Sequence, residues 1–488
     1  MPPVAAGLLV FFTSAAILVL EILAGRMLAP YVGVTLETFT GIIGTVLAGI
    51  SFGSWAGGRV ADRIHPRRLL GPLVVAGGVL ALAAPLAVAT AGAAVRNTGP
   101  LAIVILAGVG FFAPAAVLSA VTPTVVKLQL RDLDVTGTIV GRLSALATAG
   151  AIVGTFVTGF ALVAALPSRT IVLGVGAALV VAGAGVWWVL WPDRTGLGTA
   201  VVIGVLAVGT VAAVPGACDR ESPYFCASVI PEDDDPSRRL LLLDTVRHSY
   251  VDVDDPTHLQ FTYAQTMSDV LATLAPPGEP LDVLHVGGGG FTMPRYVRAT
   301  RPGSRNVVLE LDPMLVRIAE DELGLERGPD LQVITGDARL TLAGQPEGAF
   351  DVVIGDAFGG LAVPWHLTTV EFLTDLRARL RPGGVYAMNL IDYPPLGFAR
   401  AEVATLRAVF DHVAVLAPPD RLSGDDGGNF VVVASDAPLG LEAILGRNAA
   451  RGDNEAALVE CELDAFVGDA AVLTDDHAPV DQLLTTRR

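Results

Sequence analysis

The chain has 488 residues, which is enough for two or three domains. Hydrophobic residues make up 52% of it and the mean hydropathy is +0.58, too apolar for a purely soluble protein. Residues 1–216 carry 11 basic and 6 acidic residues, whereas the remainder carries 21 and 43. We therefore expect a membrane domain over residues 1–216 and an acidic soluble domain over residues 217–488, and this acidity argues against nucleic acid as a partner.

The first half contains about seven apolar stretches, each near the roughly 20 residues that a helix needs to cross a bilayer. This pattern predicts a polytopic α-helical domain in the cell membrane. Glu21 and Arg26 lie inside the first stretch, which is too long for a signal peptide. We favour packing or snorkelling for both residues over a transport role. The stretches are Val4–Met27, Phe39–Gly58, Leu69–Ala91, Leu101–Val126, Leu143–Leu166, Thr170–Trp191 and Leu197–Val214.

Two loops of this half are basic. Arg59, Arg63, Arg67 and Arg68 follow the second stretch, and Lys127, Arg131 and Arg142 flank the loop after the fourth. Basic loops stay in the cytoplasm, so both predict a cytoplasmic N-terminus. The first loop resembles the loop between the second and third helices of major-facilitator transporters, but seven spans are too few for a complete twelve-helix member.

The side of the membrane that holds the soluble half is a separate question. Seven spans from a cytoplasmic N-terminus would leave it outside, where Cys218 and Cys226 could form a disulfide. A nucleotide-type cofactor is normally available in the cytosol, and on that ground we expect a cytoplasmic soluble domain with both cysteines reduced. Together with Cys461 the three cysteines match no zinc pattern, and we expect no metal.

The soluble half centres on LDVLHVGGGGFTMPR, residues 281–295. Its apolar start predicts a buried parallel strand. Gly287, Gly288, Gly289 and Gly290 then let the backbone approach a ligand closely, and a helix follows whose amides would face that ligand.

Acidic residues end three successive predicted strands. Glu310 follows one strand, Asp337 with Ala338 the next, and Asp356 the strand over residues 350–354. A small β-element precedes them at 239–253, with a helix at 261–274. Another helix is expected over 370–380, stopped by Pro382-Gly383-Gly384 before the next strand. Alternating strands and helices predict a doubly wound α/β domain of the Rossmann type, whose carboxyl edge binds ligands.

These motifs resemble the class I S-adenosylmethionine-dependent fold and, more narrowly, the spermidine synthases, which are polyamine aminopropyltransferases. VLHVGGGG, VVLELD, VITGDAR and FDVVIGDAF carry the resemblance, with Glu221-Ser222-Pro223-Tyr224, Leu241-Leu242-Leu243-Asp244, Tyr263 and the closing LTDDHAPV as further matches. It covers about residues 217–488. With the apolar spans in front, the whole chain resembles bacterial fusions of a membrane domain to a spermidine synthase-like domain.

The resemblance implies roles for the residues. Gly287, Gly288, Gly289 and Glu310 would hold decarboxylated S-adenosylmethionine, or S-adenosylmethionine, with Glu310 on the ribose. Asp337 and Ala338 would meet the adenine. Asp356 would help to deprotonate a small-molecule amine acceptor. The residues expected at the acceptor are Tyr263, Gln265 and His248. His366 is expected there as a replacement polar group, with a surface or capping role as the alternative, and a homodimer is possible.

Several positions depart from the family pattern. Gly290 and Gly359 stand where the family usually has acids, and His248 stands near a family glutamine. These losses leave a second hypothesis open, a methyltransferase acting on an unknown acceptor. A third is a transporter or sensor whose soluble half binds a nucleoside without catalysis.

Overall fold

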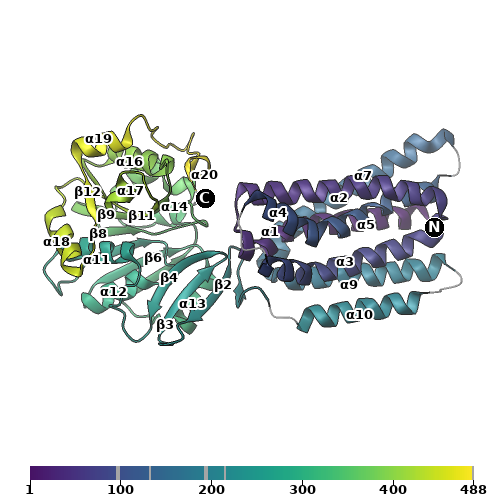
Figure 1. The fold of residues 1–488 in the computed structure, drawn as a ribbon, viewed down its shortest axis with the longest axis horizontal. Coiled ribbons are helices and arrows are strands. Elements are labelled where there is room, and N and C mark those ends of the chain that lie inside the picture. Colours follow the sequence, from purple (N-terminus) through teal and green to yellow (C-terminus); the bar gives the residue numbers. More distant parts are fainter. Residues whose placement is uncertain (95–98, 131–132, 192–195, 214–215, 486–488) are drawn as a thin grey trace. The chain divides into compact units, whose positions relative to one another are not determined.

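The computed structural model describes residues 1–94, 99–130, 133–191, 196–213 and 216–485, and Figure 1 shows their elements. Arg131 of the second basic loop, and Val214 at the end of the seventh apolar stretch, lie outside these residues. The chain divides into two compact units. The first comprises Met1–Ser228 with Leu243–Thr245, and the second comprises Val229–Leu242 with the residues from Val246 onward.

The first unit is a bundle of apolar helices. Among the described residues, six helices are long and apolar enough to cross a membrane. The seventh apolar stretch forms a helix of 17 residues, shorter than these six. The elements are α1 (Pro3–Val32), α2 (Leu36–Arg63), α3 (Pro66–Ala94), α4 (Pro100–Ala107), η1 (Gly108–Phe112), α5 (Ala113–Ser119), α6 (Val121–Gln129), η2 (Leu133–Val135), α7 (Thr136–Val157), η3 (Thr158–Leu162), α8 (Val163–Ala165), α9 (Ser168–Leu190) and α10 (Leu197–Ala213).

Glycines allow these helices to pack closely. A Cβ atom on Gly150 of α7 would lie 2.1 Å from the carbonyl oxygen of Phe11 in α1. A Cβ atom on Gly154 would lie 2.6 Å from the carbonyl oxygen of Ala15. Small residues spaced four apart thus bring the backbones of α1 and α7 together, as helices do where van der Waals contact drives association.

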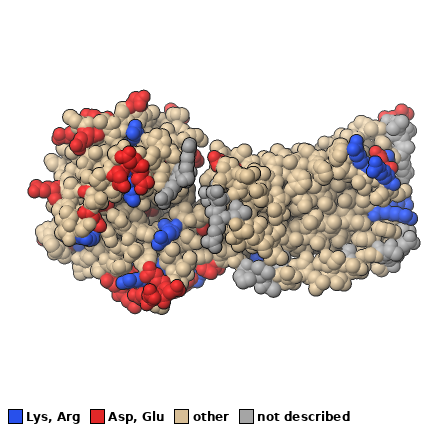
Figure 2. All heavy atoms as spheres, in the orientation of Figure 1, with Lys and Arg blue, Asp and Glu red and all other residues tan. Residues whose placement is uncertain are grey.

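The two ends of the helical unit differ in charge. At one end, Lys127 forms an ion pair with Asp62 at 2.6 Å, and Arg142 donates to the carbonyl oxygen of Pro3. On the face that Figure 2 draws, basic side chains gather at one end of this unit, with acidic ones beside them, and almost no charge lies along the helices. Because α1 has 30 residues, about 45 Å at 1.5 Å per residue, its start and its end lie at opposite ends of the unit.

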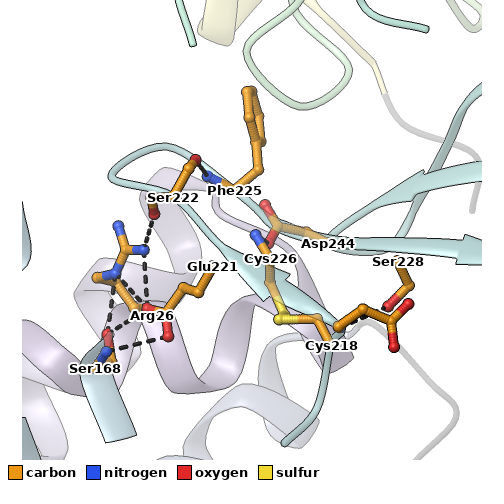
Figure 3. Close-up of a disulfide and its surroundings, with 10 residues drawn as sticks. Arg26, Ser168, Cys218, Glu221, Ser222, Phe225, Cys226, Ser228 and Asp244 are labelled. Carbon is orange, nitrogen blue, oxygen red and sulfur yellow. Dashed lines mark hydrogen bonds and ion pairs between the residues drawn. A yellow bond between two sulfur atoms is a disulfide. The ribbon is translucent and has the colours of Figure 1, made fainter. Parts of the chain in front are cut away.

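The other end of the unit is built around Arg26, near the end of α1 (Figure 3). Its guanidinium pairs with Glu221 at 2.9 Å and donates to Ser168 Oγ at 3.0 Å. It also donates to the carbonyl oxygens of Ser222 and Pro223. The side chains of Arg26 and Glu221 are only 18% and 19% exposed. Packing is therefore the role of Arg26 in this structure, as the sequence led us to favour.

A disulfide joins Cys218 to Cys226 at this same end, with Cα atoms 5.6 Å apart (Figure 3). Our expectation of reduced cysteines was wrong. The sequence allowed this disulfide, and we had expected reduced cysteines because of cofactor supply. A turn between the short strands β1 (Arg220–Glu221) and β2 (Cys226–Pro231) brings the two residues together, with Glu221 opposite Cys226 in the register. Cys461 is free and exposed.

The second unit is built on an eight-stranded mixed sheet in the order β12-β10-β11-β9-β8-β5-β6-β7. Strands β5 to β9 run parallel, whereas β10, β11 and β12 pair antiparallel at one side. The predicted doubly wound domain is thus confirmed with a mixed sheet. The strands are β5 (Asp282–Val286), β6 (Arg305–Glu310), β7 (Leu331–Thr335), β8 (Phe350–Gly355), β9 (Leu380–Asp392), β10 (His412–Ala417), β11 (Gly428–Ser435) and β12 (Ala456–Leu458).

Helices cover the sheet, and the predicted β-element is present as β3 (Arg238–Leu243) and β4 (Val246–Asp252), which belong to a sheet in the order β1-β2-β3-β4. The parallel strands β5, β6 and β8 are buried on both faces, which explains their continuous apolar runs, whereas the edge strand β7 is partly exposed. The helices are α11 (Thr262–Leu274), α12 (Thr292–Thr300), α13 (Pro313–Glu322), α14 (Ala338–Leu342), η4 (Trp365–Leu367), α15 (Val370–Arg377), α16 (Gly397–Val409), α17 (Pro419–Leu422), α18 (Leu441–Arg451), α19 (Glu460–Val467) and α20 (Val480–Leu483).

One boundary differs from the prediction. The helix expected over residues 370–380 ends at Arg377, and β9 already begins at Leu380. Strand β9 runs through Pro382-Gly383-Gly384, which we took as a stop between helix and strand. The register between β8 and β9 shifts between Phe350 and Val352. The strand pairing therefore continues past Pro382-Gly383-Gly384.

Candidate active site

The carboxyl ends of the parallel strands bring the predicted acids to one edge of the sheet. In sheet order, Asp337 follows β7, Glu310 ends β6, the glycine loop follows β5 and Asp356 follows β8. Neighbouring strands in a sheet lie about 4.8 Å apart, so these groups form a continuous row. This is the edge at which open α/β sheets bind their ligands.

The glycine loop and Glu310 hold each other in place. One carboxylate oxygen of Glu310 accepts hydrogen bonds from the amides of Gly288 at 2.8 Å and Gly289 at 3.1 Å. The other accepts from the amide of Asp312 at 2.8 Å. Glu310 is 5% exposed, and this burial raises its pKa while the three amides oppose that change. The acid at the end of β6 therefore orders the loop directly.

The same contacts test whether a ribose fits. A carboxylate has about four acceptor positions, and three of those of Glu310 are occupied. One position remains for a ribose hydroxyl, and a second hydroxyl would replace a loop amide. The loop backbone also needs glycine at position 287 to keep this close approach. Gly287 has φ +95°, and a Cβ atom added there would lie 2.4 Å from the carbonyl oxygen of Asp356.

Asp356 is held from two sides. Tyr263 of α11 donates its hydroxyl to Oδ2 at 3.1 Å, and Asn389 of β9 donates Nδ2 to Oδ1 at 2.9 Å. Asn429 of β11 donates in turn to the Asn389 side-chain oxygen at 2.9 Å. Burial raises the pKa of Asp356 to about 6, although both hydrogen bonds lower it. Burial and the nearby carboxylate raise the pKa of Tyr263 well above its usual range, so Tyr263 remains a donor.

A cavity of about 330 Å³ opens beside this carboxylate. Small-molecule sites commonly have this size. Asp356, Tyr263 and His248 line it, so the structure brings these three predicted residues together. The other lining side chains that bear on the chemistry are Arg247, Gln260, Asn389, Arg421, Asn429 and Glu455.

His248 packs between the cavity and the glycine loop. Its Nδ1 lies 3.0 Å from Ser249 Oγ, which accepts a hydrogen bond from the amide of Gly290. A Cβ atom on Gly289 would approach the His248 ring to 2.7 Å. Burial lowers the pKa of His248 to about 4, which leaves it neutral at pH 7.

The predicted residues Gln265, His366, Asp337 and Ala338 do not line the cavity. Gln265 donates to the carbonyl oxygen of Leu259 at 2.6 Å and does not line the cavity. His366 lies 3.0 Å from Asp337, so these two form a pair farther along the edge. Asp337 also caps α14, since it accepts from the amide of Arg339 at 2.8 Å, and Ala338 begins that helix.

Sequence reasoning missed several cavity residues. Asn389 and Asn429 lie inside apolar strands, where an asparagine gives no signal of its own, although a polar side chain in a buried strand must find a partner. Arg247 and Arg421 are 174 positions apart and meet only in the fold. His285 of β5 is a core residue, 1% exposed, with Nε2 3.0 Å from the side-chain oxygen of Asn306.

The chain is similar to known transferases. No family model matches the chain. It is 29% identical over 218 residues to the polyamine aminopropyltransferase of Vibrio vulnificus strain CMCP6, which covers 42% of this chain and 70% of that protein. It is 31% identical over 122 residues to the eEF1A lysine and N-terminal methyltransferase of Danio rerio, which covers 23% and 18%. Among solved structures, it resembles a probable spermidine synthase from Corynebacterium glutamicum ATCC 13032, with 28% identity and a TM-score of 0.50 over 56% of this chain and 100% of the other.

The strand order, the glycine loop and the acids at the carboxyl edge define a class I S-adenosylmethionine-dependent fold in the second unit. Within that class, the likeness to the Corynebacterium structure makes this fold spermidine synthase-like. The Vibrio relative is named a polyamine aminopropyltransferase, and these similarities support a transferase of this kind.

Proposed function

We propose that the protein is a membrane-tethered transferase that moves an aminopropyl group from decarboxylated S-adenosylmethionine to a small amine acceptor. The observation that carries this proposal is the half-buried Asp356 at the wall of the cavity, held by Tyr263 and Asn389. A carboxylate with a pKa of about 6 is suited to accept a proton near neutral pH.

The reaction needs such a group because a protonated amine cannot attack carbon. The lone pair of the acceptor nitrogen forms a bond to the methylene carbon beside the sulfonium, and the bond from that carbon to sulfur breaks. The bonding electrons stay on sulfur, and 5′-methylthioadenosine leaves. The proton lost by the nitrogen passes to Asp356. On this proposal the glycine loop and Glu310 hold the nucleoside, and Asp337 with Ala338 borders its base.

A methyltransferase is the second candidate. It is favoured because Gly290 and Gly359 stand where a polyamine enzyme is expected to have acids. The similarity to a named methyltransferase also favours it. A nucleoside-binding transporter or sensor is a third candidate, which the half-buried carboxylate of Asp356 at the cavity does not favour.

The three functions differ in their products. Full-length protein in detergent is incubated with an amine mixture and either decarboxylated S-adenosylmethionine or S-adenosylmethionine, and products are read by mass spectrometry. The proposal predicts 5′-methylthioadenosine and an amine heavier by an aminopropyl group. S-adenosylhomocysteine with a methylated product would identify a methyltransferase, and bound nucleoside without any product would identify a binding protein.

We also infer that the transferase domain lies outside the cytoplasm, in place of the cytoplasmic side that we expected from cofactor supply. Two observations support this. Lys127 and Arg142 lie at the end of the helical unit that holds the N-terminus, and basic ends stay in the cytoplasm. The disulfide Cys218–Cys226 lies at the opposite end, where the chain leaves the helices, and disulfides persist in oxidising compartments. The nucleoside co-substrate must then reach that side.

A further inference from the structure

Two arginines line the cavity beside Asp356. Arg247 lies in β4 at the exposed side of the cavity, and Arg421 lies in α17. Arg421 donates one hydrogen bond, from Nη1 to the carbonyl oxygen of Asn429 at 3.1 Å. Within the described parts of the chain, neither guanidinium has a carboxylate within 4 Å. Two unneutralised cations thus face the cavity in a domain whose sequence is strongly acidic.

The acids of the cavity do not offset these cations. Glu455 accepts hydrogen bonds from Thr266 Oγ1 at 2.6 Å and from the Asn448 amide. Burial raises the pKa of Glu455, so its carboxylate is both engaged and less readily ionised. Asp356 is engaged by Tyr263 and Asn389 and is needed for the proton.

The two positions where a polyamine enzyme is expected to hold the cationic ends of its substrate are glycines here. At Gly290 an acid has no room, because a Cβ atom would lie 2.6 Å from Ser249 Cβ. At Gly359 only Pro364 Cγ comes within 4.0 Å of a Cβ atom, so an acid would fit there. A diamine, with a cation at each end, would therefore meet two arginines and, apart from the engaged Glu455, only the carboxylate of Asp356.

We propose that the acceptor is an amine that also carries a carboxylate, as in a basic amino acid, and that Arg247 and Arg421 bind that carboxylate. Arginine binds carboxylates through paired, charge-assisted hydrogen bonds, which fix orientation as well as adding affinity. With the carboxylate at the arginines, the amine at the other end of the acceptor lies toward Asp356. This proposal rests on the proposed function, because it names the substrate class of the same site.

The test compares acceptors that differ only by the carboxylate. Ornithine is matched with putrescine and lysine with cadaverine, each with decarboxylated S-adenosylmethionine and full-length protein. Release of 5′-methylthioadenosine gives kcat/KM. We expect each amino acid to exceed its diamine at least tenfold. Arg247→Gln and Arg421→Gln should each lower kcat/KM for the amino acids at least tenfold. Neither substitution should lower kcat/KM for the diamines.

Two further variants sharpen the result. Gly359→Asp should shift the preference toward the diamines, since it returns an acid beside the cavity. Arg317→Gln, on the exposed surface of α13, should leave every rate unchanged. A wild-type enzyme that prefers diamines, or arginine variants that change both members of a pair equally, would overturn the proposal.

Binding separates this proposal from the proposed function. If no amine is turned over, the proposed function fails, and calorimetry with 5′-methylthioadenosine present still tests the arginines. Ornithine that binds the wild type at least tenfold more tightly than putrescine, and loses this advantage in both arginine variants, would support an anion-binding acceptor site. Equal binding of ornithine and putrescine would overturn it.

Discussion

Asn389 Nδ2 donates a hydrogen bond of 2.9 Å to Oδ1 of Asp356, across the neighbouring parallel strands β9 and β8. Asn389 in turn accepts a hydrogen bond from Asn429 on β11, so residues from three adjacent strands fix the direction of one carboxylate. A group held in this way is pre-organised for a reaction at the edge of the sheet. The predictions below follow from this arrangement and from the disulfide end of the helical unit.

The first prediction concerns pH. Because burial raises the pKa of Asp356 to about 6, the carboxylate gains its proton as pH falls through that value. Only the ionised form accepts a proton, so we expect kcat/KM to fall below pH 6 and to level off above it. Tyr263→Phe removes a hydrogen bond that favours the ionised form, and should move this fall to higher pH. Rates from pH 5 to 8 measure both effects.

A matched control is Tyr296→Phe, which alters another tyrosine, in α12, that does not line the cavity. Its pH profile should match the wild type. If the Tyr263 variant and the wild type lose activity at the same pH, the hydrogen bond to Asp356 has no part in the titration, and our assignment of the acidic limb is wrong.

Glu310 should control nucleoside affinity. Glu310→Gln turns an acceptor toward the amides of Gly288 and Gly289 into a possible donor, and hydrogen bonds to a charged group are worth about 1.5–3 kcal/mol. We expect 5′-methylthioadenosine to bind at least tenfold more weakly by calorimetry. Glu347→Gln, which changes an exposed acid, should bind normally. Equal affinities for all three proteins would remove the nucleoside assignment from this edge.

Arg26 should stabilise the helical unit. Arg26→Gln leaves the partly buried Glu221 without its cation, which costs about 1–3 kcal/mol for an unsatisfied charged group. Lys127→Gln breaks the exposed pair with Asp62, and such pairs contribute about 0–1 kcal/mol. Thermal unfolding in detergent should therefore show a larger loss for the Arg26 variant. A loss no greater than that of the Lys127 variant would contradict the structural role of Arg26.

The side of the membrane can be read from thiol labelling of intact cells with an impermeant reagent. If the transferase domain is outside, the free Cys461 labels at once, and Cys218 and Cys226 label only after reduction. Cys461→Ser should then give no label before reduction and two labels after it. Absence of any label on the wild-type protein in intact cells, with full labelling after lysis and reduction, would place the domain in the cytoplasm.

Much of the second unit could be predicted from its sequence because each element carries a local signal. The pattern is an apolar strand followed by glycines, with acids at the ends of the next strands. It predicted that Glu310 and Asp356 lie at one edge of the sheet. The partners of Asp356 could not be predicted in this way. Asn389 and Tyr263 are 126 positions apart, and only the packing of α11 against the sheet brings both to the carboxylate.

The errors have physical reasons as well. Pro382-Gly383-Gly384 usually interrupts structure, yet β9 passes through it because the pairing with β8 tolerates a shift in register. The state of Cys218 and Cys226 depends on the turn between β1 and β2, which composition does not reveal. Gln265 matched the resemblance in sequence position, but its amide is engaged by Leu259.

The most direct test of the account is Asp356→Asn, measured for turnover and for nucleoside affinity together. The substitution keeps the volume of the side chain and its place between Asn389 and Tyr263 but removes its ability to accept a proton. Loss of a positioned base costs about 10²–10⁴-fold in rate, and we expect kcat to fall by that amount while 5′-methylthioadenosine binds within about twofold of the wild type. Wild-type turnover in this variant would contradict the assignment of Asp356 as the proton acceptor and would favour a protein that binds nucleosides without using this carboxylate.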